Sequence, residues 1–174
     1  GRMLHDCDFV NSIPCVAMAF VSELGLETEC SALCTYVANR DSVLSDVMEY
    51  YRVDRNAAKD LFIRILHGGE VRSWRQDSSI NTNDLPLGRD LPFVTSFHSQ
   101  VDVLRGAVID SQSARQDSFG ERIRTLCNPE TRDGEDVDKV RRSVFAVILQ
   151  DREDGCLRTA ALIVEEHGYM VCSL

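Results

Sequence analysis

Residues 54–69, DRNAAKDLFIRILHGG, contain the clearest structural pattern of the chain. Apolar side chains recur there every three or four positions, which predicts an α-helix over 55–67. Asp54 is a residue type that commonly caps a helix N-terminus, and Gly68-Gly69 is a typical C-terminal stop. The stretch therefore predicts one amphipathic helix with defined ends.

This helix has two different sides when its residues are placed about 100° apart. One side carries an apolar stripe that would pack into a core, made of Ala57, Ala58, Leu61 and Ile65. The other side carries Arg55, Lys59, Ile63 and His67. Arginine can grip phosphate oxygens through two hydrogen bonds, and lysine adds a compact charge and a proton that it can release. The cationic row is a candidate triphosphate site, and the alternative is an ordinary solvated helix face.

Patterns on both sides of this helix predict the remaining elements. Apolar periodicity favours helices over 15–24, 31–37, 41–51, 93–126 and 157–167. Residues 70–91 and 128–138 are polar and rich in turn-forming types, so we expect loops there, and Gln150 is expected to open a turn. The short segments 4–11 and 169–174 are expected to be strands. The predicted fold class is α+β, with a small antiparallel sheet covered by helices and a mainly helical lobe.

Two carboxylates stand on the first predicted strand. Asp6 and Asp8 are two residues apart, and side chains two apart in a strand point to the same side. Two carboxylates on one face can share a hard cation, whose charge offsets their mutual repulsion. The pair is therefore a candidate Mg²⁺ site. The alternative is that the two acids cap the following turn or face water.

Composition limits the class of protein. The chain has 174 residues, 44% of them hydrophobic and 27% charged, which fits one compact domain with a real core. No apolar run approaches the roughly 20 residues that span a bilayer, so we expect no membrane partner. The net charge of −9 argues against a protein that simply coats nucleic acid. Residues 51–129, however, have 11 basic and 10 acidic side chains and are nearly neutral.

The cysteine pattern indicates the redox state of the compartment in which the protein functions. It has seven cysteines, an odd number without a C-x-x-C pair, so we expect free thiols in a reducing, intracellular compartment. Cys30 and Cys34 are one helical turn apart, but no second pair of ligands lies near them in the sequence, and zinc is not expected.

Three segments in the same order resemble a known enzyme family. Arg55 and Lys59, followed by His67-Gly68, resemble the fingers helix of family A DNA polymerases and phage-type single-subunit RNA polymerases, with His67 in place of a tyrosine. The run Asp8-Phe9-Val10-Asn11 resembles their first palm motif. Residues 150–174 resemble the segment that leads to their last palm motif, whose His-Asp pair is absent from this sequence.

The resemblance implies a palm-like strand and helices over 1–53, a helical fingers-like region over 54–128 and a return to the palm over 129–174, as subregions of one structural domain. It implies template-directed nucleotidyl transfer by a diverged or truncated palm and fingers. The implied ligands are a nucleoside triphosphate, a primer–template and two Mg²⁺ ions. Further parts of a larger polypeptide are possible partners.

The resemblance also implies roles for individual residues. Asp8, with Asp6, would hold the metal ions. Arg55 and Lys59 would grip the triphosphate, and Lys59 would protonate the leaving pyrophosphate. His67 and Gly68 would lie beside the nascent base pair. Gln150 and Arg158 would lie near the template–primer groove.

Two alternatives stay open at the level of the sequence. The first is a non-catalytic, acidic, helix-rich domain with an interaction or structural role. The second is a primase-like nucleotidyltransferase that uses the Asp6-x-Asp8 pair, although the third acid and the later histidine motif of such enzymes are not evident. Trp74, the sole tryptophan, is expected to anchor the core rather than to stack on a base.

Overall fold

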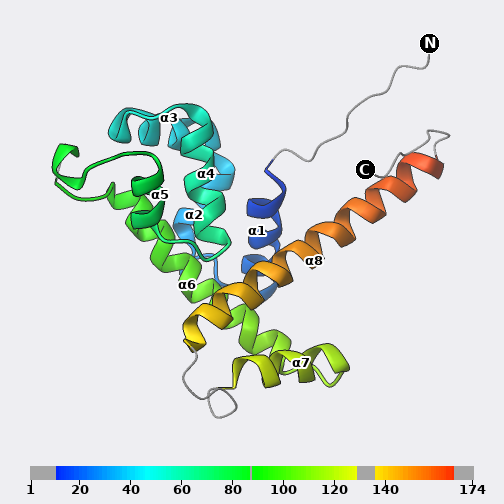
Figure 1. Ribbon diagram of the computed structural model, residues 1–174. Helices are drawn as coiled ribbons and strands as arrows, with labels where there is room; N and C mark the ends of the chain where they lie inside the picture. The colour runs from blue at the N-terminus through cyan, green and yellow to red at the C-terminus, as the bar shows by residue number, and fades with distance from the viewer. Residues whose placement is uncertain (1–10, 87, 129–135, 167–174) are drawn as a thin grey trace.

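The computed structural model describes residues 11–86, 88–128 and 136–166, and its elements there are helices joined by short connections (Figure 1). The α-helices are α1 (Ser12–Leu24), α2 (Ser31–Ala38), α3 (Arg40–Tyr51), α4 (Arg55–Leu66), α5 (Val71–Asp77), α6 (Pro92–Ser113), α7 (Ser118–Cys127) and α8 (Val137–Glu166). A short 3₁₀-helix, η1, covers Thr82–Asp84.

The prediction of an α+β fold with a palm-like antiparallel sheet is wrong. The described residues form no strand, and the fold is all-helical. The two segments expected to be strands, 4–11 and 169–174, lie outside the described residues except for Asn11, which belongs to a turn. In the described part the apolar helix faces meet one another directly and form one core, so no sheet is needed to cover them.

Local signals set several helix ends as the sequence predicted. The Asp54 carboxylate accepts a hydrogen bond of 2.8 Å from the Ala57 N–H, which caps α4. Gly25 follows α1 with φ +66°, a left-handed conformation that glycine adopts at little cost. Helices α1 to α4 therefore lie close to their predicted ranges.

Helix α4 is one of the most deeply packed elements, because Ala58, Leu61, Phe62, Ile65 and Leu66 are all fully buried. It packs against α1, α3, α5 and α6. The Phe62 ring lies 4.3 Å from the Tyr36 ring and 4.9 Å from the Phe97 ring, measured between centroids. These aromatic pairs join α2, α4 and α6.

Helix α5 was not expected, because residues 70–91 were predicted to be a loop. Trp74 anchors this short helix to α4: it is 1% exposed, and its indole N–H donates a hydrogen bond of 3.0 Å to the Ala57 carbonyl. Its ring also meets Tyr51 edge-to-face at 5.1 Å. The prediction that Trp74 is a core anchor is confirmed.

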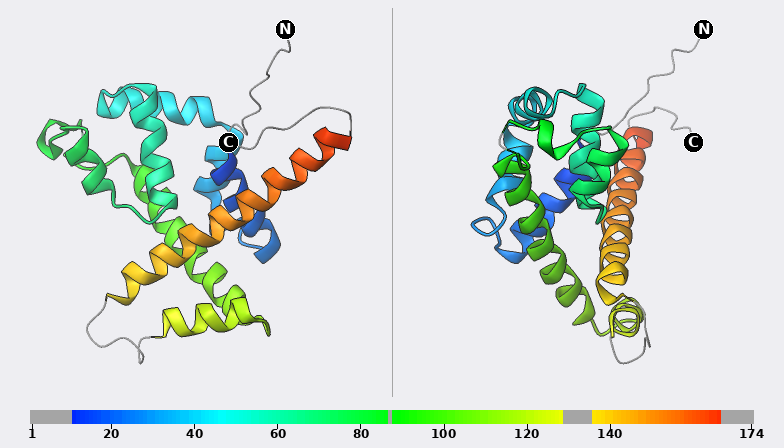
Figure 2. Two further views of the ribbon diagram at one scale, coloured as in Figure 1. Left: turned by 45° about the vertical axis from the view of Figure 1, so that its right-hand side comes forward. Right: turned by 60° about the vertical axis from the view of Figure 1, so that its left-hand side comes forward.

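Helix α8 differs most from the sequence expectation. It continues through Gln150, where a turn was predicted, and through Gly155, where no helix was predicted. Its first half packs against α1, α6 and α7. Its second half extends away from the other helices, as Figure 1 and the left view of Figure 2 show. Within the described residues, no helix is long and apolar enough to cross a membrane.

Candidate functional site

The predicted cationic row lies along the edge of α4 that adjoins its buried face. The Arg55 guanidinium donates to Asp41 Oδ1 at 2.5 Å, and this contact holds the pKa of Asp41 below its usual value. The two side chains are 48% and 83% exposed. An ion pair so open to water is weak, so Arg55 can exchange Asp41 for another anion at little cost.

Lys59 lies one turn further along α4 and is partly exposed. In the part of the chain that the structure describes, it forms no ion pair. Its ammonium group and the Arg55 guanidinium belong to residues about 6 Å apart along the helix axis. The two cations can therefore contact neighbouring phosphates of one ligand.

Helix α8 lies against the C-terminal end of the cationic row of α4. Gly68 has φ +82°, and a Cβ placed on it would lie 2.6 Å from Arg142 Cβ. His67 Nε2 is buried and has no hydrogen-bond partner among the described residues. Gly68 therefore packs closely against α8, and the stacking of His67, which is half-buried, beside a base pair stays a prediction.

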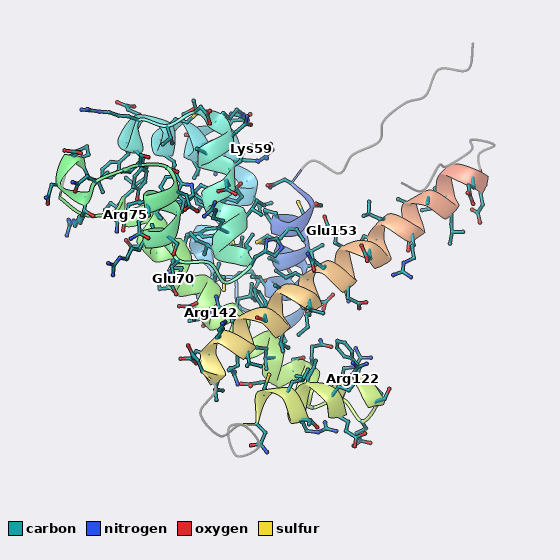
Figure 3. The ribbon with its side chains drawn as sticks, in the orientation of Figure 1. Lys59, Glu70, Arg75, Arg122, Arg142 and Glu153 are labelled. Carbon is teal, nitrogen blue, oxygen red and sulfur yellow. The ribbon has the colours of Figure 1, made fainter. Side chains whose placement is uncertain are left out.

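A polar cluster that sequence reasoning missed lies beside this contact (Figure 3). The Glu70 carboxylate accepts a hydrogen bond from the Arg142 guanidinium of α8 and lies 3.7 Å from His98 Nε2 of α6. Arg142 also lies 4.0 Å from the Asp136 carboxylate. Glu70 thus links the start of α5 to α6 and α8. The sequence offered no signal for it, because its partners are 28 and 72 positions away.

Two further predicted site residues that the structure describes lie on α8 and not on the α4 row. Gln150 and Arg158 are exposed on α8, and Arg158 Nε donates to the Asp154 carbonyl of its own helix, at 3.4 Å. Asp6 and Asp8 lie outside the described residues. Of the predicted site residues that the structure describes, Arg55 and Lys59 share α4, and His67-Gly68 follow at its C-terminal end.

No group of three or more potential metal ligands occurs among the described residues. The Mg²⁺ site at Asp6 and Asp8 stays a prediction. Cys30 and Cys34 form no disulfide, and burial raises the pKa of the Cys30 thiol to about 11, with Cys34 and Glu29 adding smaller effects. A thiol with so high a pKa is a poor metal ligand and a poor nucleophile near neutral pH.

A shallow hollow of about 620 Å³ lies between α3 and the segment that leads into α6. Its polar lining consists of Asp46, Glu49 and Arg52, with Tyr50 and Phe93 among the apolar walls. It contains none of the predicted site residues. Two carboxylates at its rim make it unsuited to phosphate.

Comparison with known proteins gives one informative likeness. The chain is 23% identical over 152 residues to a protein of the Sputnik virophage named "Putative helicase V13". The matched region covers 87% of this chain and 17% of the virophage protein, so the chain spans about a sixth of that relative's length. No protein-family model matches the chain, and no solved structure matches it.

These findings overturn the predicted function. Template-directed nucleotidyl transfer needs a sheet that holds the metal-binding carboxylates, and the described residues are all helical. The likeness is to a protein named as a helicase, not to a polymerase. The non-catalytic alternative, an acidic domain with an interaction or structural role, gains no clear support from the comparison either.

Proposed function

We propose that this chain is a helical accessory domain of a helicase-type viral protein and lies outside the ATP-hydrolysing motor. The observation that carries the proposal is the likeness to the helicase-named virophage protein over most of this chain. The sequence adds a second argument. A phosphate-binding loop needs a glycine directly before its lysine, whereas the two lysines, Lys59 and Lys139, follow Ala58 and Asp138.

Within this proposal, the domain contacts nucleic acid through Arg55 and Lys59 on α4. Lys59 has no ion pair among the described residues, and Arg55 is held only by an exposed acid. Seven of the fourteen other arginines that the structure describes pair with described carboxylates, as Arg64 does with Asp60 and Asp77. A contact of two cations on an acidic protein is weak and depends strongly on salt.

The test is the binding of a fluorescently labelled single-stranded oligonucleotide, measured by anisotropy over a range of salt concentrations. Two phosphate contacts predict a slope of log Kobs against log salt of about −1.4, and Lys59→Ala should reduce its size by about 0.7. Lys139→Ala, at the exposed start of α8, is the matched control and should leave the slope unchanged.

The same samples are assayed for ATP hydrolysis. We expect none above the protein-free background, with or without the oligonucleotide. Hydrolysis by the wild-type chain would contradict its place outside the motor. An equal reduction of the salt slope in Lys59→Ala and Lys139→Ala would contradict the contact at α4. The absence of oligonucleotide binding at low salt would contradict it as well.

A further inference from the structure

Arginines from two helices approach one exposed carboxylate at the junction of α3 and α4. Arg55 Nη2 of α4 lies 2.5 Å from Asp41 Oδ1 of α3. Arg40 is the first residue of α3 and the chain neighbour of Asp41. The hydrogen bond and the charge of Arg55 hold the pKa of Asp41 below its usual value, and the charge of Arg40 adds to this effect. Both guanidinium groups therefore act on the same carboxylate.

The buried side chain of Tyr36 lies at the same junction. Tyr36 belongs to α2 and is 0% exposed, and its ring centroid lies 4.3 Å from that of Phe62 on α4. Burial raises the pKa of Tyr36, while a hydrogen bond with Arg40 and the charges of Arg40 and Arg55 act in the opposite direction. A fixed, buried phenol restricts the positions that a guanidinium bound to it can take. Tyr36 thus holds Arg40 near Arg55.

The cations at this junction outnumber the carboxylate that pairs with them. Among the described residues Arg40 forms no ion pair, and its buried Nε has no hydrogen-bond partner. Lys59 follows Arg55 by one turn on α4 and is labelled in Figure 3. Within the described ranges, Asp41 is thus the carboxylate paired with a group of three cations. A further anion would be attracted to this place.

Asp41 can yield its position to such an anion. Its side chain is 83% exposed and that of Arg55 is 48% exposed, so the ion pair between them is weak in water. When this carboxylate turns away it stays hydrated, and no charge is left buried. The Asp41 oxygen therefore marks a position where an oxygen of an incoming anion can accept a hydrogen bond from Arg55.

The arrangement favours a phosphate with three free oxygens. A phosphodiester inside a nucleic-acid strand carries about one negative charge. A terminal phosphate carries about −1.5 to −2 near pH 7 and has three strong acceptor oxygens. Each arginine presents a planar fork of donors that can bind two oxygens at once. Two arginines therefore match the charge and the oxygens of a terminal phosphate better than those of a phosphodiester.

We propose that Arg40 and Arg55 bind the terminal phosphate of a nucleic-acid strand. Tyr36 positions Arg40, and Lys59 contacts the next phosphate of the strand. The inference rests on the proposed function, because it refines the nucleic-acid contact at Arg55 and Lys59 into recognition of a strand end. It adds to that contact two residues from other helices, Arg40 of α3 and Tyr36 of α2.

Three single-stranded oligonucleotides of one sequence test the inference. One has a 5′-phosphate, one has a 3′-phosphate, and one has hydroxyl groups at both ends. Each carries an internal fluorescent label, and its binding to the full chain is measured by anisotropy at low salt. We expect at least one phosphorylated strand to bind about tenfold more tightly than the hydroxyl strand. Adenosine 5′-monophosphate should compete only weakly, because it lacks the second phosphate that Lys59 contacts.

Three variants locate the preference for a phosphorylated end. Arg40→Gln should abolish it and leave the affinity for the hydroxyl strand nearly unchanged. Tyr36→Phe keeps the ring in the core and loses the hydroxyl group, so it should reduce the preference. Arg122→Gln removes the same charge at an exposed site on α7 (labelled in Figure 3) and should leave the preference unchanged. Far-UV circular dichroism checks that each variant stays folded.

Equal affinity for all three strands would overturn this inference and leave the contact at Arg55 and Lys59 standing. A preference that survives Arg40→Gln, or that Arg122→Gln removes equally, would overturn it as well. Competition by adenosine 5′-monophosphate as strong as that by the unlabelled phosphorylated strand would assign the site to a free nucleotide and overturn the strand-end assignment. Failure of every strand to bind would overturn the proposed function together with this inference.

Discussion

Replacing Trp74 with alanine tests how α5 is held to the rest of the fold. The side chain is 1% exposed, donates a hydrogen bond to the Ala57 carbonyl of α4 and meets the Tyr51 ring edge-to-face. Because Trp74 is the buried side chain of α5 and docks on α4, its removal should loosen the segment that leads from α4 to α6. The variant Trp74→Ala should therefore lower the free energy of unfolding strongly.

The size of the effect follows from the burial of the side chain. Truncation of a buried tryptophan to alanine costs about 3–5 kcal/mol. Whole domains are stable by only about 5–15 kcal/mol. For a chain of this length each kcal/mol lowers Tm by about 2–4 °C, so a loss of 4 kcal/mol corresponds to about 8–16 °C. Trp74→Phe keeps much of the apolar contact and loses the N–H donor, which should cost about 1–2 kcal/mol.

Urea unfolding followed by circular dichroism at 222 nm measures both variants on the same scale. In the wild-type chain Trp74 is the sole tryptophan, so its fluorescence should be blue-shifted and should change together with the helix signal. A loss below about 1 kcal/mol for Trp74→Ala, or wild-type fluorescence typical of an indole in water, would refute the packing described for α5.

Two further perturbations probe other contacts. Gly68→Ala should cost at least about 1 kcal/mol more than Gly25→Ala in urea unfolding, because both positions have positive φ but only at Gly68 would the new Cβ collide with Arg142. Equal costs would contradict the close contact of Gly68 with α8. The raised pKa of Cys30 means that the native thiol keeps its proton where the unfolded one has lost it, so stability should fall as the pH rises from about 9 to about 11. Cys30→Ala should make this loss of stability with pH shallower, whereas Cys15→Ala, at an exposed cysteine, should leave it unchanged. Identical pH profiles for the wild-type chain and both variants would contradict the attribution of this loss to the Cys30 thiol.

The sequence predicted best what depends on neighbouring residues. The cap at Asp54, the stop at Gly25 and the apolar stripe of α4 all follow from local spacing, and the structure has them near the predicted positions. The burial of Trp74 was also predictable, because a lone tryptophan is more often part of a core than of a binding face.

Predictions from the sequence were wrong where packing between distant segments determines the structure. Helix α5 forms in a polar segment because Trp74 docks on α4, a contact 17 positions away. Helix α8 passes through Gly155 because one glycine in an exposed helix costs only about 1 kcal/mol. The two expected strands led to the α+β class, yet the described helices fill one core by themselves. The cationic row of α4 was predicted. The approach of Arg142 to Gly68 at the C-terminal end of this row depends on a contact between elements that are distant in the sequence.

The all-helical account of the described residues depends on the continuity of α8, which backbone chemical shifts measured by NMR test most directly. The structure predicts helical ¹³Cα and ¹³C′ shifts without interruption from Val137 to Glu166, including Gln150 and Gly155, and no strand-like shifts within residues 11–86, 88–128 and 136–166. A break to turn-like shifts at 150–156, or cross-strand contacts within these ranges, would contradict it.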